Sequence, residues 1–188
     1  LLFDKSRENP SKTVTLNRTK RSEGPFFKLL YEGHKILTYI FAGKLIKFGN
    51  YSCIPKADVA KLAKEACIWS SFSGSVTKVI SDRVSVPSIR GQRYFGPSQM
   101  NLFSLLIHSF SIIAVFRGTV IVRSVLFIIF YLLFFYNNLS IITLLPAFAV
   151  LILLFLILKV SSRENIEELN NSLENIGSID ILGNLNGR

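Results

Sequence analysis

The stretch RGQRYFGPSQMN, residues 90–101, separates two parts of the chain that differ in composition. It contains two arginines, a Tyr-Phe pair and a Gly-Pro break, and it ends where a helical pattern begins. Cations and aromatic side chains together are what the headgroup layer of a membrane selects. We therefore interpret this stretch as the point where a cytoplasmic domain enters a membrane surface.

Charge is divided unevenly across this boundary. Residues 1–100 contain 17 Lys and Arg against 7 Asp and Glu, a net charge of +10, whereas residues 101–188 contain 5 of each kind. A basic excess suits anionic headgroups, phosphate groups or nucleic acid. Because apolar spans follow directly, we expect membrane lipid and phosphate as partners. Nucleic acid is not expected, since the basic residues are not interleaved with an aromatic stacking platform.

The beginning of the chain and its cysteines give two further indications. The chain starts at Leu1 and its only methionine is Met100, so we expect that the N-terminal part of the protein is missing. No signal peptide is visible at the start. Cys53 and Cys67 are too few and too unpatterned for a disulfide or zinc framework, and they fit a reducing cytoplasm.

Residues 1–97 alternate between strand and helix patterns, which predicts an α/β domain. A polar segment ending in a turn comes first, and alternating or short apolar runs then predict strands at 13–18, 48–54 and 82–89. Apolar residues spaced three and four apart predict helices at 25–42, 56–66 and 68–80. Arg18, Lys20 and Arg21 cluster where the first strand ends, the place where α/β folds put ligand-binding groups. A solvated run of charges is the alternative interpretation of that cluster.

Residues 98–118 predict an interfacial amphipathic helix. Their polar residues Asn101, Ser104, His108 and Ser111 are spaced so that they share one helical stripe. The stretch of about 16 residues gives roughly 24 Å of helix, which is short for a span. We predict that the helix lies in the plane of the membrane, with a short buried span as the alternative. His108 is expected to face the protein rather than to bind a metal.

Residues 119–160 predict two transmembrane helices, at 119–136 and 141–158, each about 27 Å long. Only four uncharged residues separate them, so they form a tight hairpin, and Arg123 in the first span is expected to snorkel outward. Cations flank only the outer ends of the hairpin, which places both ends in the cytoplasm. Residues 161–188 predict a cytoplasmic amphipathic helical tail.

Four stretches, taken in order, resemble a known family. They are NRTKRSEG (17–24), FGNYSCIP (48–55), WSSFSGSVTK (69–78) and RGQRYFGPSQMNLFSLLIHSFSIIAVF (90–116). The chain looks like the C-terminal half of a membrane-anchored family-two glycosyltransferase of the polyprenyl-phosphate sugar transferase type, which includes dolichol-phosphate mannosyltransferases. The resemblance covers nearly the whole chain up to the second span.

The resemblance implies the acceptor side of such an enzyme. Residues 1–97 would be the C-terminal part of a GT-A (Rossmann-like) domain. Its catalytic residues and its Asp-x-Asp metal motif for Mg²⁺ or Mn²⁺ are expected upstream, because this chain contains no Asp-x-Asp and would be inactive alone. Arg18, Arg21 and Arg93 would bind the acceptor phosphate, and Asn50 and Tyr51 would line the acceptor pocket. The family often has an acidic residue where Asn50 stands, so no catalytic base is assigned there.

Two functions from different classes follow. The first is an integral enzyme of a bacterial-type plasma membrane that moves a sugar from a nucleotide sugar to a lipid-linked acceptor, such as undecaprenyl phosphate, or to a cell-envelope glycan. The second is a non-catalytic membrane adaptor with a basic cytoplasmic domain. Both functions allow the protein to form a homo-oligomer. An Asp-x-Asp encoded upstream of Leu1 would favour the enzyme.

Overall fold

The computed structural model describes residues 1–20, 25–89 and 101–175. A mixed three-stranded sheet has the order β2-β1-β3, with β1 (Thr13–Lys20) in the centre. β2 (Phe48–Cys53) runs antiparallel to β1, and β3 (Arg83–Ile89) runs parallel to it. All three predicted strands are confirmed within two residues at each end. A small mixed α/β domain is thus present, as the alternating patterns indicated.

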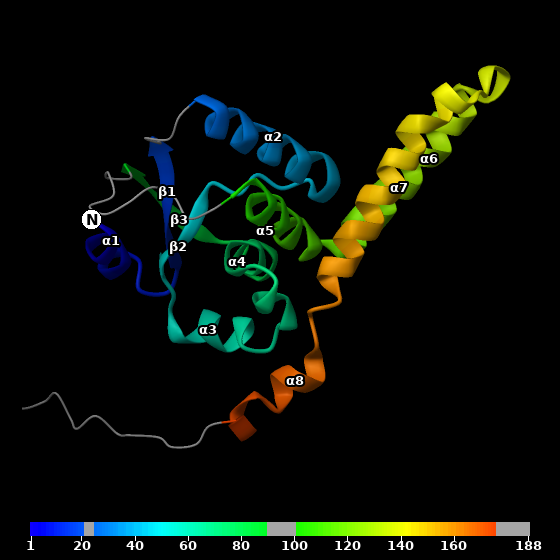
Figure 1. The fold of residues 1–188 in the computed structure, drawn as a ribbon. Helices are drawn as coiled ribbons and strands as arrows, with labels where there is room; N and C mark the ends of the chain where they lie inside the picture. Colours follow the sequence, from blue (N-terminus) through cyan, green and yellow to red (C-terminus); the bar gives the residue numbers. More distant parts are fainter. Residues whose placement is uncertain (21–24, 90–100, 176–188) are drawn as a thin grey trace, which may run out of the picture.

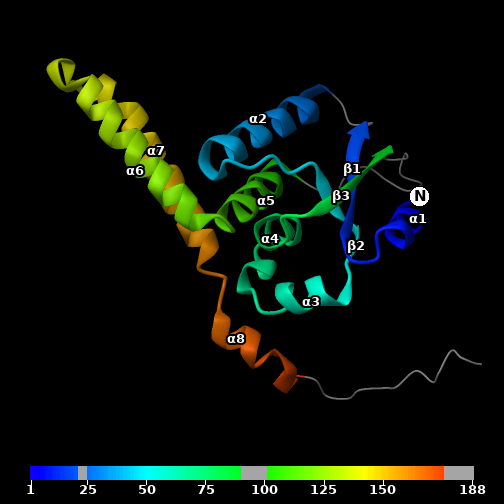
Figure 2. The same ribbon diagram turned by 180° about the vertical axis from the view of Figure 1, so that it is seen from behind.

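Helices lie on both sides of this sheet. The short α1 (Leu2–Glu8) lies on one side, and α4 (Phe72–Val79) lies on the other side together with α3 (Lys56–Leu62) (Figures 1 and 2). The predicted helix at 25–42 is confirmed in both bounds as α2 (Pro25–Ala42). The helix predicted at 68–80 is instead a 3₁₀ turn, η1 (Ala66–Trp69), followed by α4. The break comes at Ser71, whose hydroxyl accepts the N–H of Gly74 at 3.2 Å and so starts a new helix.

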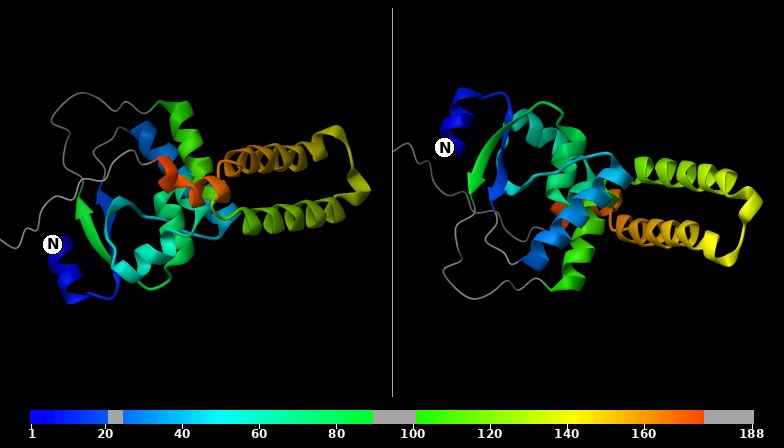
Figure 3. Two further views of the ribbon diagram at one scale, coloured as in Figure 1. Left: turned by 90° about the horizontal axis from the view of Figure 1, so that it is seen from below. Right: turned by 90° about the horizontal axis from the view of Figure 1, so that it is seen from above.

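Two apolar helices leave the domain as an antiparallel pair. They are α6 (Arg117–Phe134) and α7 (Ile141–Ser161), joined by the 3₁₀ turn η2 (Tyr136–Asn138), and we call α6, η2 and α7 the hairpin (Figure 3). At 18 and 21 residues they measure about 27 and 32 Å. Both are long and apolar enough to cross a membrane, and only 11% of each apolar window is buried inside the structure.

The base of the hairpin is packed into the domain. α5 (Leu102–Ala114) precedes it, and the largest group of buried apolar residues joins α2 and α5 to both hairpin helices. Ile113, Val120 and Ile157 are fully buried there. At 13 residues, about 20 Å, α5 is shorter than a span. Within the described residues the hairpin is therefore an extension of the domain core rather than a flexible appendage.

One expectation about a polar segment was wrong, and that for the tail is tested only up to residue 175. The polar stripe of α5 does not lie against the protein, because Asn101, Ser104 and His108 are exposed and only Ser111 is buried. The tail forms only a five-residue helix, α8 (Ile166–Asn170), and a 3₁₀ turn, η3 (Ser172–Asn175), before the described residues end. The run Asn-Asn-Ser that follows Leu169 favours turns over a continuous helix.

Candidate functional site

The carboxyl ends of β1 and β3 meet at one edge of the sheet because the two strands are parallel. Arg18 pairs with Ser88, and Lys20 pairs with Ile89. Between these pairs, the Thr19 hydroxyl donates to the Ser88 carbonyl oxygen at 3.0 Å. We call the ends of β1 and β3, residues 18–20 and 88–89, the basic edge. The chain continues from this edge into the segments 21–24 and 90–100.

A bulge in β2 lies beside this edge. Thr15 pairs with Ser52 and Asn17 pairs with Phe48, so three residues of β2 stand opposite Leu16 alone. Those three are Gly49, Asn50 and Tyr51. A bulge bends its strand and redirects side chains away from the regular ladder. In agreement, Asn50 is exposed and Tyr51 is 71% exposed.

The predicted acceptor residues are only partly described by the structure. The backbone of Arg18 and the bulge that carries Asn50 and Tyr51 come from neighbouring strands, so the structure brings these positions together. Arg21 and Arg93 lie outside the described residues. What the described part shows is that the strands leading to Arg21 and Arg93 end side by side at the basic edge.

The opposite end of the sheet holds a buried carboxylate that the sequence analysis did not single out. Asp58 at the start of α3 accepts a hydrogen bond from the fully buried hydroxyl of Thr13 and one from Lys61, each at 2.8 Å. The hydrogen bonds from Lys61 and then Thr13 hold the pKa of Asp58 below its ordinary value. This contact joins α3 to the first residue of β1, so we assign it to stability.

Two arginines close the ends of helices. Arg83 on β3 donates from Nη1 to the carbonyl oxygens of Val76 (3.0 Å) and Ile80 at the end of α4, and it lies 5.6 Å from the centroid of the Phe48 ring. Burial lowers the pKa of the Arg83 guanidinium. In the hairpin, Arg123 donates in the same way to carbonyl oxygens at the end of α2. Cations that meet the unpaired carbonyls of a last turn stabilise that end of the helix.

The contact made by Arg123 fixes the hairpin to α2. Its Nη1 donates to the carbonyl oxygens of Tyr39 and Ile40, at 3.2 and 3.1 Å. Gly43, at φ +67°, ends α2 in the left-handed conformation, and its N–H donates to the Tyr39 carbonyl at 2.9 Å. A Cβ at Gly43 would lie 2.6 Å from Nη2 of Arg123. Arg123 therefore reaches back to the domain, which the expectation of simple snorkelling did not include.

Two buried polar side chains, Glu164 and Cys67, also lie at the hairpin base. Glu164, just after α7, is 6% exposed and lies 3.7 Å from Nη1 of Arg117, so it ties the two ends of the hairpin together. Cys67 nearby accepts a hydrogen bond from the Ser75 hydroxyl at 3.3 Å. Burial raises the pKa of the Cys67 thiol, and the Ser75 bond only partly offsets this. The geometry therefore gives an inert, packed cysteine.

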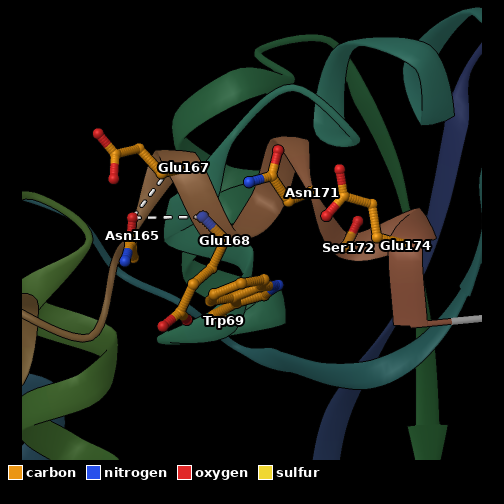
Figure 4. Close-up of a pocket in the computed structure, with 7 residues that line it drawn as sticks. All are labelled: Trp69, Asn165, Glu167, Glu168, Asn171, Ser172 and Glu174. Carbon is orange, nitrogen blue, oxygen red and sulfur yellow. Dashed lines mark hydrogen bonds between the residues drawn. The ribbon is translucent and has the colours of Figure 1, made fainter.

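A cavity of about 490 Å³ lies between η1 and the tail, away from the basic edge. Figure 4 shows Trp69 below the tail, and Asn165 accepting the N–H groups of Glu167 and Glu168 at 2.9 and 3.3 Å. The lining residues are one aromatic, three carboxylates and three small polar side chains: Trp69, Glu167, Glu168, Glu174, Asn165, Asn171 and Ser172. Clustered carboxylates repel a phosphate. This cavity is consequently a poor site for a phosphorylated acceptor.

A whole enzyme of this type is expected to bind a metal ion. In the part of the chain that the structure describes, no group of three or more His, Cys, Asp or Glu side chains is arranged to hold one. We therefore assign no step through a metal to these residues. Comparisons of the chain with protein-family models, with curated proteins and with solved structures found no match.

Proposed function

We propose that the chain is the acceptor-side part of a membrane-anchored glycosyltransferase. In the reaction, a phosphate oxygen of a polyprenyl phosphate attacks the anomeric carbon of a nucleotide sugar, and the bond to the nucleoside diphosphate breaks. The residues of this chain would bind and position the acceptor phosphate. The donor and the metal would be held by residues encoded upstream, within a complete GT-A domain.

The observation that carries the proposal is the parallel pairing of β1 and β3. Because of this pairing the two strands end side by side, and the segments that follow them in the chain contain Arg21 and Arg93. Guanidinium groups bind phosphate through two parallel hydrogen bonds, so arginines in the segments that follow two paired strands suit a phosphate clamp. The bulge with Asn50 and Tyr51 adds exposed side chains beside that edge.

The surroundings of the basic edge suit an acceptor with a lipid chain. The segment after β1 leads into α2, and the segment after β3 leads into α5. Both helices contact α6 at the base of the hairpin. A long isoprenoid chain is accommodated only by a bilayer or an apolar groove, so a phosphate site that adjoins apolar helices is what such an acceptor requires. We place the domain on the cytoplasmic side, because the hairpin tip is uncharged and its base carries the cations.

The test compares a phosphate with its alcohol. The protein is reconstituted into nanodiscs, and its affinity for undecaprenyl phosphate is compared with that for undecaprenol. A charge-assisted contact contributes about 1.5–3 kcal/mol, so Arg93→Ala should weaken phosphate binding about 10- to 100-fold, at 1.36 kcal/mol per tenfold. Arg93→Lys should recover part of this, because a point charge lacks the planar fork.

Arg163→Ala is the matched control, since Arg163 is a cation close to the hairpin but not at the basic edge. It should leave binding unchanged. Equal affinity for phosphate and alcohol would reject the acceptor site and favour the adaptor. A chain extended by its upstream coding sequence should transfer labelled sugar from a nucleotide sugar to undecaprenyl phosphate, and an upstream sequence without Asp-x-Asp would also count against the enzyme.

A further inference from the structure

The outward side of α2 is aliphatic. Leu29, Ile36 and Ile40 are 70%, 58% and 57% exposed, and with Gly33 they follow the four-three-four spacing of one helical stripe. Away from this stripe, Phe41 and Ala42 pack into the core of the domain. A helix on the surface of a water-soluble domain normally turns a polar face outward. We call Leu29, Ile36 and Ile40 the outer stripe of α2.

A helix that contacts α2 also has exposed apolar side chains. α2 contacts α5, on which Phe103 and Leu106 are 71% and 51% exposed. Both helices run across the direction of the hairpin at its base (Figures 1 and 3). Exposed apolar side chains are therefore carried by the hairpin and by two helices that lie crosswise to it, and both of these helices contact α6. This contact with a candidate span points to lipid as the material that covers α2.

Arg123 sets the level of α2 along the hairpin. It lies six residues after Arg117, the first residue of α6, which is about 9 Å along the helix. Its bonds to the Tyr39 and Ile40 carbonyls place the last turn of α2 at this same level. A guanidinium in a membrane is held near the headgroups rather than in the hydrocarbon. A spanning α6 consequently brings α2 to the headgroup layer.

The lysines that follow α2 suit the same headgroup layer of a membrane. Leu45 is 57% exposed, and it stands between the exposed Lys44 and Lys47. Lysines on either side of an inserted apolar residue are typical of segments that bind anionic leaflets.

We propose that α2 is an in-plane membrane helix. Its outer stripe rests at the boundary between headgroups and acyl chains of an anionic leaflet, on the side from which the hairpin enters, and Arg123 holds it at that depth. This inference rests on the proposed insertion of the hairpin. It adds a second lipid contact to the domain and lays the domain against the leaflet, instead of suspending it below two spans.

Tryptophan fluorescence tests the inference, because Trp69 is the only tryptophan of the chain. In a Trp69→Phe background, single tryptophans replace Ile36, Ile40 and, as a matched exposed aliphatic on α3, Val59. The full chain is reconstituted into phosphatidylcholine–phosphatidylglycerol vesicles whose acyl chains are brominated near the headgroup. At Ile36 and Ile40 we expect a blue-shifted emission and about a twofold loss of intensity, as for insertion of about 5–10 Å. At Val59 we expect neither.

A tryptophan at Phe130, in the second half of α6, separates this inference from the proposed function. Quenching at Phe130 but not at Ile36 or Ile40 would overturn the in-plane helix while leaving the anchored enzyme intact. Absence of quenching at Phe130 would reject insertion of the hairpin and, with it, both proposals. Tryptophans on α2 that are shielded from iodide yet not quenched by bromine would also overturn the inference, because a second copy or a protein partner would then cover the outer stripe.

Discussion

Removing the Arg123 side chain should loosen α2 from the hairpin. In Arg123→Ala, the carbonyl of Ile40 loses its charged donor, while the carbonyl of Tyr39 keeps the N–H of Gly43 at 2.9 Å. Hydrogen bonds to a charged group contribute about 1.5–3 kcal/mol each, but Arg123 is exposed in the structure, so solvent weakens them. We therefore expect a total loss of about 1–3 kcal/mol.

Hydrogen–deuterium exchange of the protein in nanodiscs measures this loss locally. With 1.36 kcal/mol for each tenfold change, amides in the last turn of α2 should exchange about 5- to 150-fold faster in the variant. The exchange rate in Arg123→Lys should lie between those of the wild type and Arg123→Ala, because lysine keeps one donor group but lacks the planar guanidinium fork. Gly43→Ala should speed exchange at the same amides, since it combines a positive φ with a contact of 2.6 Å to the guanidinium.

Arg117→Ala is the matched control for this series. Arg117 lies on the same helix but pairs with Glu164 at 3.7 Å, and no contact with α2 is among its described interactions. Its removal should change exchange near Glu164 and leave α2 as it is. If Arg123→Ala left the last turn of α2 as protected as in the wild type, the guanidinium would not hold α2 to the hairpin, and the argument for the depth of α2 would lose its main support.

Two predictions concern the domain itself. Asp58→Asn should destabilise the protein by about 1–2 kcal/mol at neutral pH, because it weakens the bonds from Thr13 and Lys61. The pKa of Asp58 is lowered in the fold, so the stability that its carboxylate contributes is present above the ordinary carboxyl pKa. That contribution is lost as pH falls through the lower folded pKa. The midpoint temperatures of thermal unfolding of wild type and variant should therefore converge below about pH 4. Cys67, 2% exposed and with a raised pKa, should react with iodoacetamide far more slowly than the half-buried Cys53. Mass spectrometry of the alkylated peptides would show it, and comparable rates would mean that the packing around Cys67 opens readily.

The regular elements were predictable because their signals are local. The helix at 25–42 starts with proline and ends with a glycine that the structure places at positive φ, and both of its predicted bounds are confirmed. The hairpin follows from two long apolar runs around four uncharged residues. The break before α4 also had a local signal, since Ser71 is a favoured N-cap residue, but the apolar spacing on both sides concealed it.

The tertiary contacts of single charged residues were not predictable in the same way. Nothing near Arg123 in sequence reveals that it meets the end of a helix 83–84 residues away. Arg83 bonds to the end of a helix only 3–7 residues before it, but apolar spacing does not reveal that contact either. The same holds for Asp58, which bonds to Thr13 across 45 residues. Periodicity describes faces of helices, whereas these contacts depend on which faces meet. The predicted acceptor residues share this limit, and in the described residues the pairing of β1 with β2 and with β3 relates their positions.

α2 shows how far the periodicity of a sequence and the tertiary structure differ in what they reveal. Its sequence is apolar on most sides, so periodicity alone allowed it either to pack on a sheet or to lie against a membrane. The structure separates these options by face: Phe41 and Ala42 are buried in the core, while Ile36 and Ile40 are exposed on a different face. Packing on the domain thus accounts for Phe41 and Ala42 but not for Ile36 and Ile40. A second apolar medium that covers these two side chains would account for their exposure, and the hairpin attached to α2 through Arg123 is long and apolar enough to cross such a medium.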